Sequence, residues 1–377
     1  MAANSSYFTD PVGRWPDTEE TAAWDALIGQ SACGNRFLKS DCLKMLQETD
    51  SYGTKFSRIS LRDASGNMLA AWALPYRQHL GFRYATYFDF FYAGPVLAPE
   101  ISATKDRMDL LAELARGQQA FLPVIETEAH LKFHDGRGLQ YAGFTLQQLY
   151  TNLWDFSDPD AVFASMNRER RRLIRRAGER FRFAKLPRET AADLFLPLYL
   201  ELIKKFNWVP MPQWQQDLRK RIDWLYATDA GFVFGAWDEA DVLQAAVILL
   251  NSPEDRTTYL WRCGYRADPT GNSVIPGLYW HACQEVFQVW GGPMTANFGG
   301  SPRPSLAVFK DSLGSQVAAH LRLTYERPGL QTRAWKHLRR RKEDLRWLLS
   351  KTGALSLISN RPRKEVPPVE MEIQADA

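Results

Sequence analysis

The stretch Asn297-Phe-Gly-Gly-Ser301, with Leu306-Ala-Val-Phe-Lys310 shortly after it, is the part of the sequence from which the fold can be worked out. A β-rich run over 294–298 ends in two glycines and a serine. Glycines after a strand let the backbone turn sharply and approach a bound molecule closely. Residues 305–313 then have apolar side chains at helical spacing, which predicts a short helix. Its apolar stripe consists of Leu306, Phe309 and Leu313.

Lys310 lies at the edge of this stripe. An ammonium in that position must either extend to solvent along its aliphatic stem or be used by the protein. A strand, a small-residue turn and a lysine-bearing helix therefore follow one another, and this order predicts a substrate-holding turn with a positive charge close by.

The composition is that of a soluble globular protein with room for two domains. The chain has 377 residues, of which 45% are hydrophobic and 24% charged. A net charge of +4 is small for this length, and it allows an anionic substrate without requiring nucleic acid. The cysteines form no CxxC pair and no group with histidine, which favours reduced, buried thiols. They are Cys33, Cys42, Cys263 and Cys283.

The start of the chain is polar and lacks the basic and apolar regions of a signal peptide. No stretch approaches the roughly eighteen consecutive apolar residues of a membrane span. The sequence therefore predicts a cytoplasmic protein.

Helical and β periodicities alternate along the chain and predict a mixed α+β fold in two domains, over 1–155 and 156–328. The second domain opens at Ser157-Asp158-Pro159, where a capping residue precedes a proline in the first turn of a helix. Both halves read as helices, a β-meander, a helix and a strand, which hints at duplication. Residues 329–377 read as a basic helix followed by a disordered, Pro- and Glu-containing tail.

Each of two basic segments has a purely structural and a functional interpretation. The helix after Ser157 has an arginine-rich face, which is either solvated or suited to phosphates through its planar guanidinium groups. These arginines are Arg168, Arg170, Arg171, Arg172, Arg175 and Arg176. The pattern over 332–350 is either a solvated terminal helix packed on the protein or a peripheral contact with an anionic membrane surface.

The loop before a helix predicted over 275–290 contains Gly271, Asn272 and Ser273. Small residues that enter a helix offer free backbone N–H groups and a positive dipole end, which suit a pyrophosphate. The loop matches neither a Walker A motif nor a dinucleotide fingerprint. His130 and His134 are not part of an HExxH pattern, and we expect neither a metal nor a tightly bound cofactor.

Taken together, several pieces resemble the FemAB-like and BioF2-like acyltransferases, which are tandem proteins with the acetyltransferase (GNAT-like) fold. The matching pieces in the second half are Arg172-Leu-Ile-Arg-Arg-Ala-Gly178, the run over 259–280, Asn297–Ser301, and Phe309-Lys310 before Leu313-Gly314. Those in the first half are Asn35-Arg-Phe-Leu-Lys-Ser40, Gly94-Pro-Val96 and Gly143-Phe144. The resemblance covers roughly residues 20–328.

The resemblance implies two GNAT-like domains packed around a cleft. It implies transfer of an acyl or aminoacyl group from acyl-CoA or aminoacyl-tRNA to an amine, such as that of an envelope or polysaccharide precursor. Lys310 would be the catalytic residue, as a fixed positive charge that stabilises an oxyanion. Substrate contacts are implied for Lys39, Lys44, Arg172, Arg175, Gly299, Gly300 and Ser301. The donor pyrophosphate would lie at Gly271, Asn272 and Ser273.

Two other functions stay open at this point. The protein could be a GNAT-like scaffold or binding protein in an envelope pathway, without catalysis. It could also bind nucleic acid through the arginine helix and the basic tail, which predicts a steep salt dependence of binding. The chain lacks the interleaved aromatic and basic residues of a nucleic-acid platform, and no general base stands out from the sequence.

Overall fold

A computed structural model describes residues 8–9, 18–51, 53–79, 81–85, 92–204, 212–266, 274–301, 303–329 and 332–333. The contacts divide the chain into two compact units. Unit 1 contains the described residues up to Leu149 and from His320 onward, and unit 2 contains Tyr150–Ala319. The divisions fall inside strands β7 (Thr145–Asp155) and β13 (Gln316–Glu326), whereas the predicted domain limits lie at 155 and 328.

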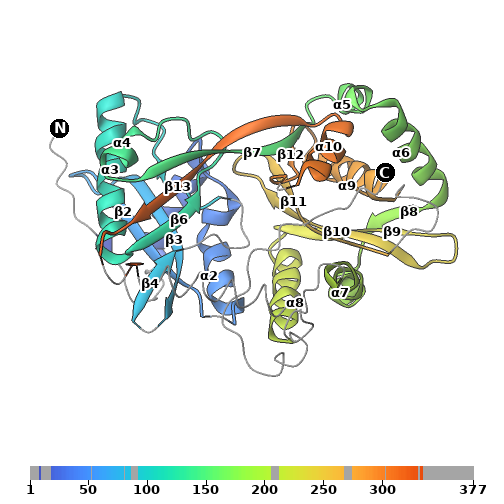
Figure 1. Cartoon of the computed structure of the whole chain (residues 1–377), viewed down its shortest axis with the longest axis horizontal. Coiled ribbons are helices and arrows are strands. Elements are labelled where there is room, and N and C mark those ends of the chain that lie inside the picture. Colours follow the sequence, from blue (N-terminus) through green and yellow to red (C-terminus); the bar gives the residue numbers. More distant parts are fainter. Residues whose placement is uncertain are drawn as a thin grey trace. The chain divides into compact units, whose positions relative to one another are not determined.

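Unit 1 contains a β-meander, and its helices precede and follow the meander in the chain (Figure 1). Its helices are α1 (Thr18–Gln30), the short η1 (Arg36–Leu38), α2 (Ser40–Thr49), α3 (Thr104–Phe121) and α4 (Arg137–Tyr141). Its strands, besides parts of β7 and β13, are β1 (Phe8–Thr9), β2 (Lys55–Arg62), β3 (Met68–His79), β4 (Phe82–Ala85), β5 (Val96–Leu97) and β6 (Val124–Glu128).

Unit 2 repeats this combination of helices and a β-meander. Its helices are α5 (Pro159–Ser165), α6 (Arg168–Arg180), α7 (Arg188–Lys204), α8 (Pro212–Ala227), α9 (Val274–Trp290) and α10 (Pro304–Ser312). Its strands, besides parts of β7 and β13, are β8 (Arg182–Lys185), β9 (Gly231–Trp237), β10 (Leu243–Ser252), β11 (Thr257–Tyr265) and β12 (Thr295–Asn297).

The two units share one strand plan. In unit 2, the antiparallel strands β9, β10 and β11 are followed by α9 and by β12, which pairs parallel to β11 and antiparallel to β7. In unit 1, the antiparallel strands β2, β3 and β4 are followed by α3 and by β6, which pairs parallel to β4 and antiparallel to β13. A parallel pair needs a crossover, and α9 and α3 supply it.

In unit 2, helices cover both faces of the meander: α7 and α8 lie on one face, and α6 and α9 lie on the other (Figure 1). Because both faces are covered, every residue of β9 and β11 is buried. A glycine lets β11 and α7 approach each other closely, since a Cβ at Gly264 of β11 would lie 2.6 Å from the backbone nitrogen of Tyr199 on α7.

In unit 1, α3 packs against β2 and β3 through a fully buried amide. Gln118 of α3 accepts a hydrogen bond from the Ser57 hydroxyl and donates to the carbonyl oxygens of Ser57 and Trp72. Both its donors and its acceptor are therefore satisfied.

Within the described ranges, no helix combines the length and the apolar character that a membrane span requires.

Candidate functional site

Lys310 lies on α10 of unit 2 and is buried, with 4% of its surface exposed. Its ammonium donates hydrogen bonds to three consecutive carbonyl oxygens: those of Phe298 at 3.1 Å, Gly299 at 2.9 Å and Gly300 at 2.5 Å. A lysine ammonium has three N–H donors, so these contacts match its donor capacity. The side chain is thus used by the protein to hold the loop that follows β12.

The helix that carries this lysine is anchored as its apolar pattern predicts. Leu306, Phe309 and Leu313 are all buried in the core of unit 2. The stripe fixes α10 against the sheet, and Lys310, one residue after Phe309, is thereby directed at the end of β12. The prediction of a helix over 305–313 agrees with the observed bounds of Pro304–Ser312.

Gly299 makes the turn at the end of β12. Its φ of +74° lies in the left-handed region, where a side chain would be strained. Its N–H donates to the side-chain oxygen of Asn297, which also accepts a hydrogen bond from the Thr151 hydroxyl at 2.8 Å. Asn297 is fully buried. The asparagine therefore joins β12, β7 and the turn.

Asn152 of β7 holds the loop from a second side. Its side-chain oxygen accepts a hydrogen bond from the Ser301 hydroxyl at 2.9 Å, and its amide nitrogen donates to the Ser315 hydroxyl at 3.0 Å. Ser315 in turn donates to the backbone carbonyl of Lys310 at 2.9 Å. Side chains from β7 and α10 thus both hydrogen-bond to the loop 298–301.

Aromatic rings pack behind the loop. Trp154 meets Phe298 edge to face with ring centroids 4.5 Å apart, and its indole N–H donates to the carbonyl of Leu313. Tyr279 of α9 also packs against Phe298, with ring centroids 5.8 Å apart. Burial raises the pKa of Tyr279 well above its usual value and that of the nearby Cys263 thiol to about 12. Both groups therefore stay protonated and neutral at physiological pH.

The arginine-rich helix is α6, and one of its arginines reaches α10. Arg170 donates through Nε to the Ser312 hydroxyl at 2.8 Å, and its guanidinium lies over the Phe309 ring. Partial burial lowers the pKa of this guanidinium below its usual value. Arg172 instead pairs with Glu169 on the exposed surface, and Arg175 lies over the ring of Phe163.

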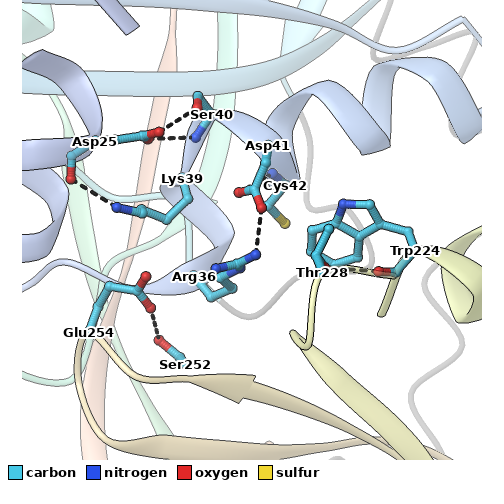
Figure 2. A network of polar contacts seen from close by, with 10 residues as sticks. All are labelled: Asp25, Arg36, Lys39, Ser40, Asp41, Cys42, Trp224, Thr228, Ser252 and Glu254. Atoms are coloured by element: carbon cyan, nitrogen blue, oxygen red, sulfur yellow. Dashed lines mark hydrogen bonds and ion pairs between the residues drawn. The ribbon is translucent and has the colours of Figure 1, made fainter. Parts of the chain in front are cut away.

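The two lysines predicted from the first half of the chain lie in unit 1 around α2. Lys39 donates to the backbone carbonyl of Asp25 at 3.0 Å, and the carboxylate of Asp25 accepts hydrogen bonds from the N–H and hydroxyl of Ser40 (Figure 2). Lys44 is exposed and lies 4.0 Å from Glu48. The substrate contacts predicted for Lys39 and Lys44 stay predictions.

The structure brings four of the predicted site residues together, namely Lys310, Gly299, Gly300 and Ser301. Gly271, Asn272 and Ser273, predicted to hold a pyrophosphate, lie outside the described residues, as does most of the basic segment over 332–350. In the described part of the chain, no group of three or more histidine, cysteine or acidic side chains could hold a metal ion.

Sequence reasoning missed Asn152, and it named Arg170 in the arginine-rich face without singling it out. Asn152 stands in the strand pattern Tyr150-Thr-Asn-Leu-Trp154, and an amide side chain inside a predicted strand was the available signal. Arg170 had no such signal, because nothing in a run of arginines separates the one that contacts α10 from its neighbours.

No family model and no curated protein sequence matches the chain significantly. Solved structures do match it, and the fold they share is that of tandem GNAT proteins. This confirms the predicted fold class of mixed α+β, GNAT-like domains.

FemX has a TM-score of 0.61 at 11% identity, over 80% of this chain and 95% of its own. A tandem GNAT protein from the clavulanic acid biosynthesis pathway has a TM-score of 0.54 at 11% identity, over 87% of this chain and 100% of its own. The L-PGS of Bacillus licheniformis has a TM-score of 0.50 at 12% identity, over 85% of this chain and 95% of its own.

Proposed function

We propose that the protein is an N-acyltransferase, which moves an acyl or aminoacyl group from an activated carrier to an amine at the loop 298–301 of unit 2. The single observation that carries the proposal is the loop itself. Its three successive carbonyl groups are bound by one buried ammonium, in a fold also found in a tandem GNAT protein. A loop fixed this firmly at a strand end suits the positioning of a reacting carbonyl.

The reaction needs the two reactants to be positioned, a proton to be removed from the amine and an oxyanion to be stabilised. The amine nitrogen attacks the carbonyl carbon of the donor, a C–N bond forms, and the carbonyl oxygen becomes an oxyanion. The bond to the leaving thiol or ribose oxygen then breaks, and the proton lost by the amine leaves with that group. Positioning of the two reactants and stabilisation of the oxyanion are the parts of this reaction that a fixed loop can supply.

The charge of Lys310 supports a role in such a reaction. An ammonium held in a buried site lies in a medium of low dielectric constant, where its field on developing negative charge is stronger than in water. Arg170 adds a second half-buried cation beside Phe309. Both charges lie in unit 2, as does the loop.

Two donors fit this proposal, acyl-CoA and aminoacyl-tRNA, and the acceptor is an amine, for which an envelope or polysaccharide precursor is our candidate. One neighbour in the fold comparison was solved as a form without acetyl-CoA, which favours the thioester as the first donor to test. Gly271, Asn272 and Ser273 are the candidate contacts for the pyrophosphate of that donor, and Arg172 and Arg175 are candidates for further phosphates.

The test is a transfer assay on the full chain with two donors: acetyl-CoA, and a mixture of aminoacylated tRNAs. The acceptors are amino sugars and lysine-ended peptides, and the amide product is measured by mass spectrometry. We expect product from one donor class with the wild type, and a loss of product with Lys310→Ala. A Lys105→Ala control, which removes an exposed lysine paired with Asp109, should keep the wild-type rate. A wild type that forms no amide from either donor would refute the proposal.

A further inference from the structure

Lys310 fixes the direction of the amide groups of the loop as well as that of its carbonyls. The described residues contain no cis peptide bond, and in a trans peptide the C=O of one residue and the N–H of the next point in opposite directions. Because the carbonyls of Gly299 and Gly300 point at the ammonium, the N–H groups of Gly300 and Ser301 point away from it.

These two N–H groups are available, whereas the two before them are not. The N–H of Phe298 donates to the carbonyl of Asn152, and that of Gly299 donates to the side chain of Asn297. The N–H groups of Gly300 and Ser301 have no acceptor among the described residues. Gly300 is also exposed to solvent and has no side chain to cover its backbone.

We infer that the amides of Gly300 and Ser301 are the oxyanion donors of the proposed acyl transfer, and that Lys310 is the positioning residue that aims them. The inference rests on the proposed function. Successive backbone N–H groups next to a left-handed residue form a concave anion site, and Gly299 is such a residue here. As the amine attacks, the electron pair of the donor's carbonyl moves onto its oxygen, and the two N–H groups stabilise the resulting oxyanion by donating hydrogen bonds to it.

This assignment differs from the one suggested by the family resemblance, in which the ammonium itself meets the oxyanion. In the structure, the ammonium donates hydrogen bonds to three carbonyl oxygens of the loop. The lysine therefore acts through the backbone. Its charge also polarises the peptide groups whose oxygens it binds, and two of these carry the N–H groups of Gly300 and Ser301, which become better donors.

The first test removes one N–H and keeps the rest of the loop. Gly300 does not have a positive φ, and a Cβ added there would lie 3.5 Å from the carbonyl oxygen of Tyr150, an ordinary contact. Gly300→Ala therefore keeps both the loop and the N–H, while Gly300→Pro removes the N–H. We expect the kcat of Gly300→Pro to be about 100-fold or more below that of Gly300→Ala, with little change in KM.

The second test needs no substrate. Amide hydrogen exchange of the wild type, followed by NMR on glycine- and serine-labelled protein, should show Gly300 and Ser301 exchanging within about tenfold of an unstructured peptide. The Gly299 amide, bonded to Asn297, should exchange more slowly. In Lys310→Met the protection of Gly299 should fall, because the loop is no longer held.

The outcomes separate the two claims. If the wild type transfers and Gly300→Pro, still folded by its melting temperature, keeps the wild-type kcat, the oxyanion assignment is wrong and the acyltransferase proposal stands. Slow exchange of Gly300 or Ser301 overturns the assignment even if Gly300→Pro does not fold. If the wild type transfers from no donor, the proposed function fails and the assignment falls with it.

Discussion

A buried ammonium such as that of Lys310 is stable only when its lost hydration is replaced, since an unpaired buried charge costs several kcal/mol. The carbonyls of Phe298, Gly299 and Gly300 provide that replacement. The same contacts restrain a loop that contains two glycines. Glycine loses more conformational entropy on ordering than any other residue, so these contacts offset that cost. Charge burial and loop order are therefore coupled in one residue.

Tyr226 offers a prediction at the same scale. Its hydroxyl donates to the carbonyl of Leu186 at 2.7 Å and accepts from the N–H of Val233, and burial raises its pKa to about 12. An unfolded tyrosine titrates near 10, so between about pH 10 and 12 the unfolded chain holds fewer protons. The stability that Tyr226 contributes is thus present below pH 10 and is lost as the pH rises through 12.

The measurement is the free energy of unfolding in urea at pH 8, 10 and 11.5 for the wild type and Tyr226→Phe. We expect the variant to be less stable by about 1–2 kcal/mol at pH 8, because a buried N–H loses its acceptor, and the difference to shrink at pH 11.5. Tyr141→Phe, at an exposed tyrosine, is the control. A difference between wild type and Tyr226→Phe that does not change with pH would contradict this.

The sequence predicted part of the site at the residue scale. Apolar spacing placed Leu306, Phe309 and Leu313 in the core and Lys310 at their edge, because the period of a helix is a local property. The three carbonyl partners of Lys310 could not be predicted, since they depend on how the chain turns at Gly299. The contact of Asn152 with Ser301 joins residues far apart in sequence, and single-sequence patterns carry no such pairing.

At the scale of elements, the two units place corresponding side-chain pairs at the end of the inner parallel strand. In unit 2, Asn297 at the end of β12 bonds Thr151 of β7. In unit 1, Glu128 at the end of β6 bonds His320 of β13 at 2.9 Å. The duplicated order of elements was visible in the sequence as a repeated plan. The pairing of β13 with β6 was not, because that strand returns from the other end of the chain.

The end of α10 gives a second prediction. Gly314 has a φ of +69°, and a Cβ there would lie 2.2 Å from the Ser165 hydroxyl oxygen and 2.8 Å from the Ser165 carbonyl carbon. Gly314→Ala must therefore displace the end of α10 from α5. We expect the variant to lose about 2–4 kcal/mol in the free energy of unfolding and to lose turnover as well, because α10 carries Lys310.

Gly291→Ala is the matched control for this change. Gly291 has a similar φ of +62°, but no atom lies within 4 Å of an added Cβ. The control should lose only about 1 kcal/mol in the free energy of unfolding, which is the cost of placing alanine in the left-handed backbone region. Equal losses in the two variants, measured by urea denaturation, would show that the contact between Gly314 and Ser165 does not matter for stability.

At the scale of the whole molecule, the fold is shared with solved structures at 11–12% identity. Hydrophobic periodicity survives such divergence because it requires only apolar residues at the right spacing. A fold alone does not determine an activity, so the functional claim depends on the loop of unit 2. The donor and the acceptor could not be predicted from the sequence, because their contacts depend on shape and on residues outside the recognisable motifs.

The most direct measurement is the kcat for amide formation by the full-length Lys310→Met variant relative to the wild type, at a saturating concentration of the donor that the wild type uses. Methionine is an unbranched side chain one atom shorter than lysine, and it removes the charge and the three hydrogen bonds. Lys105→Met is the control at an exposed position. The account predicts a fall of about 100-fold or more in a variant that still unfolds cooperatively. Wild-type turnover by folded Lys310→Met would contradict it.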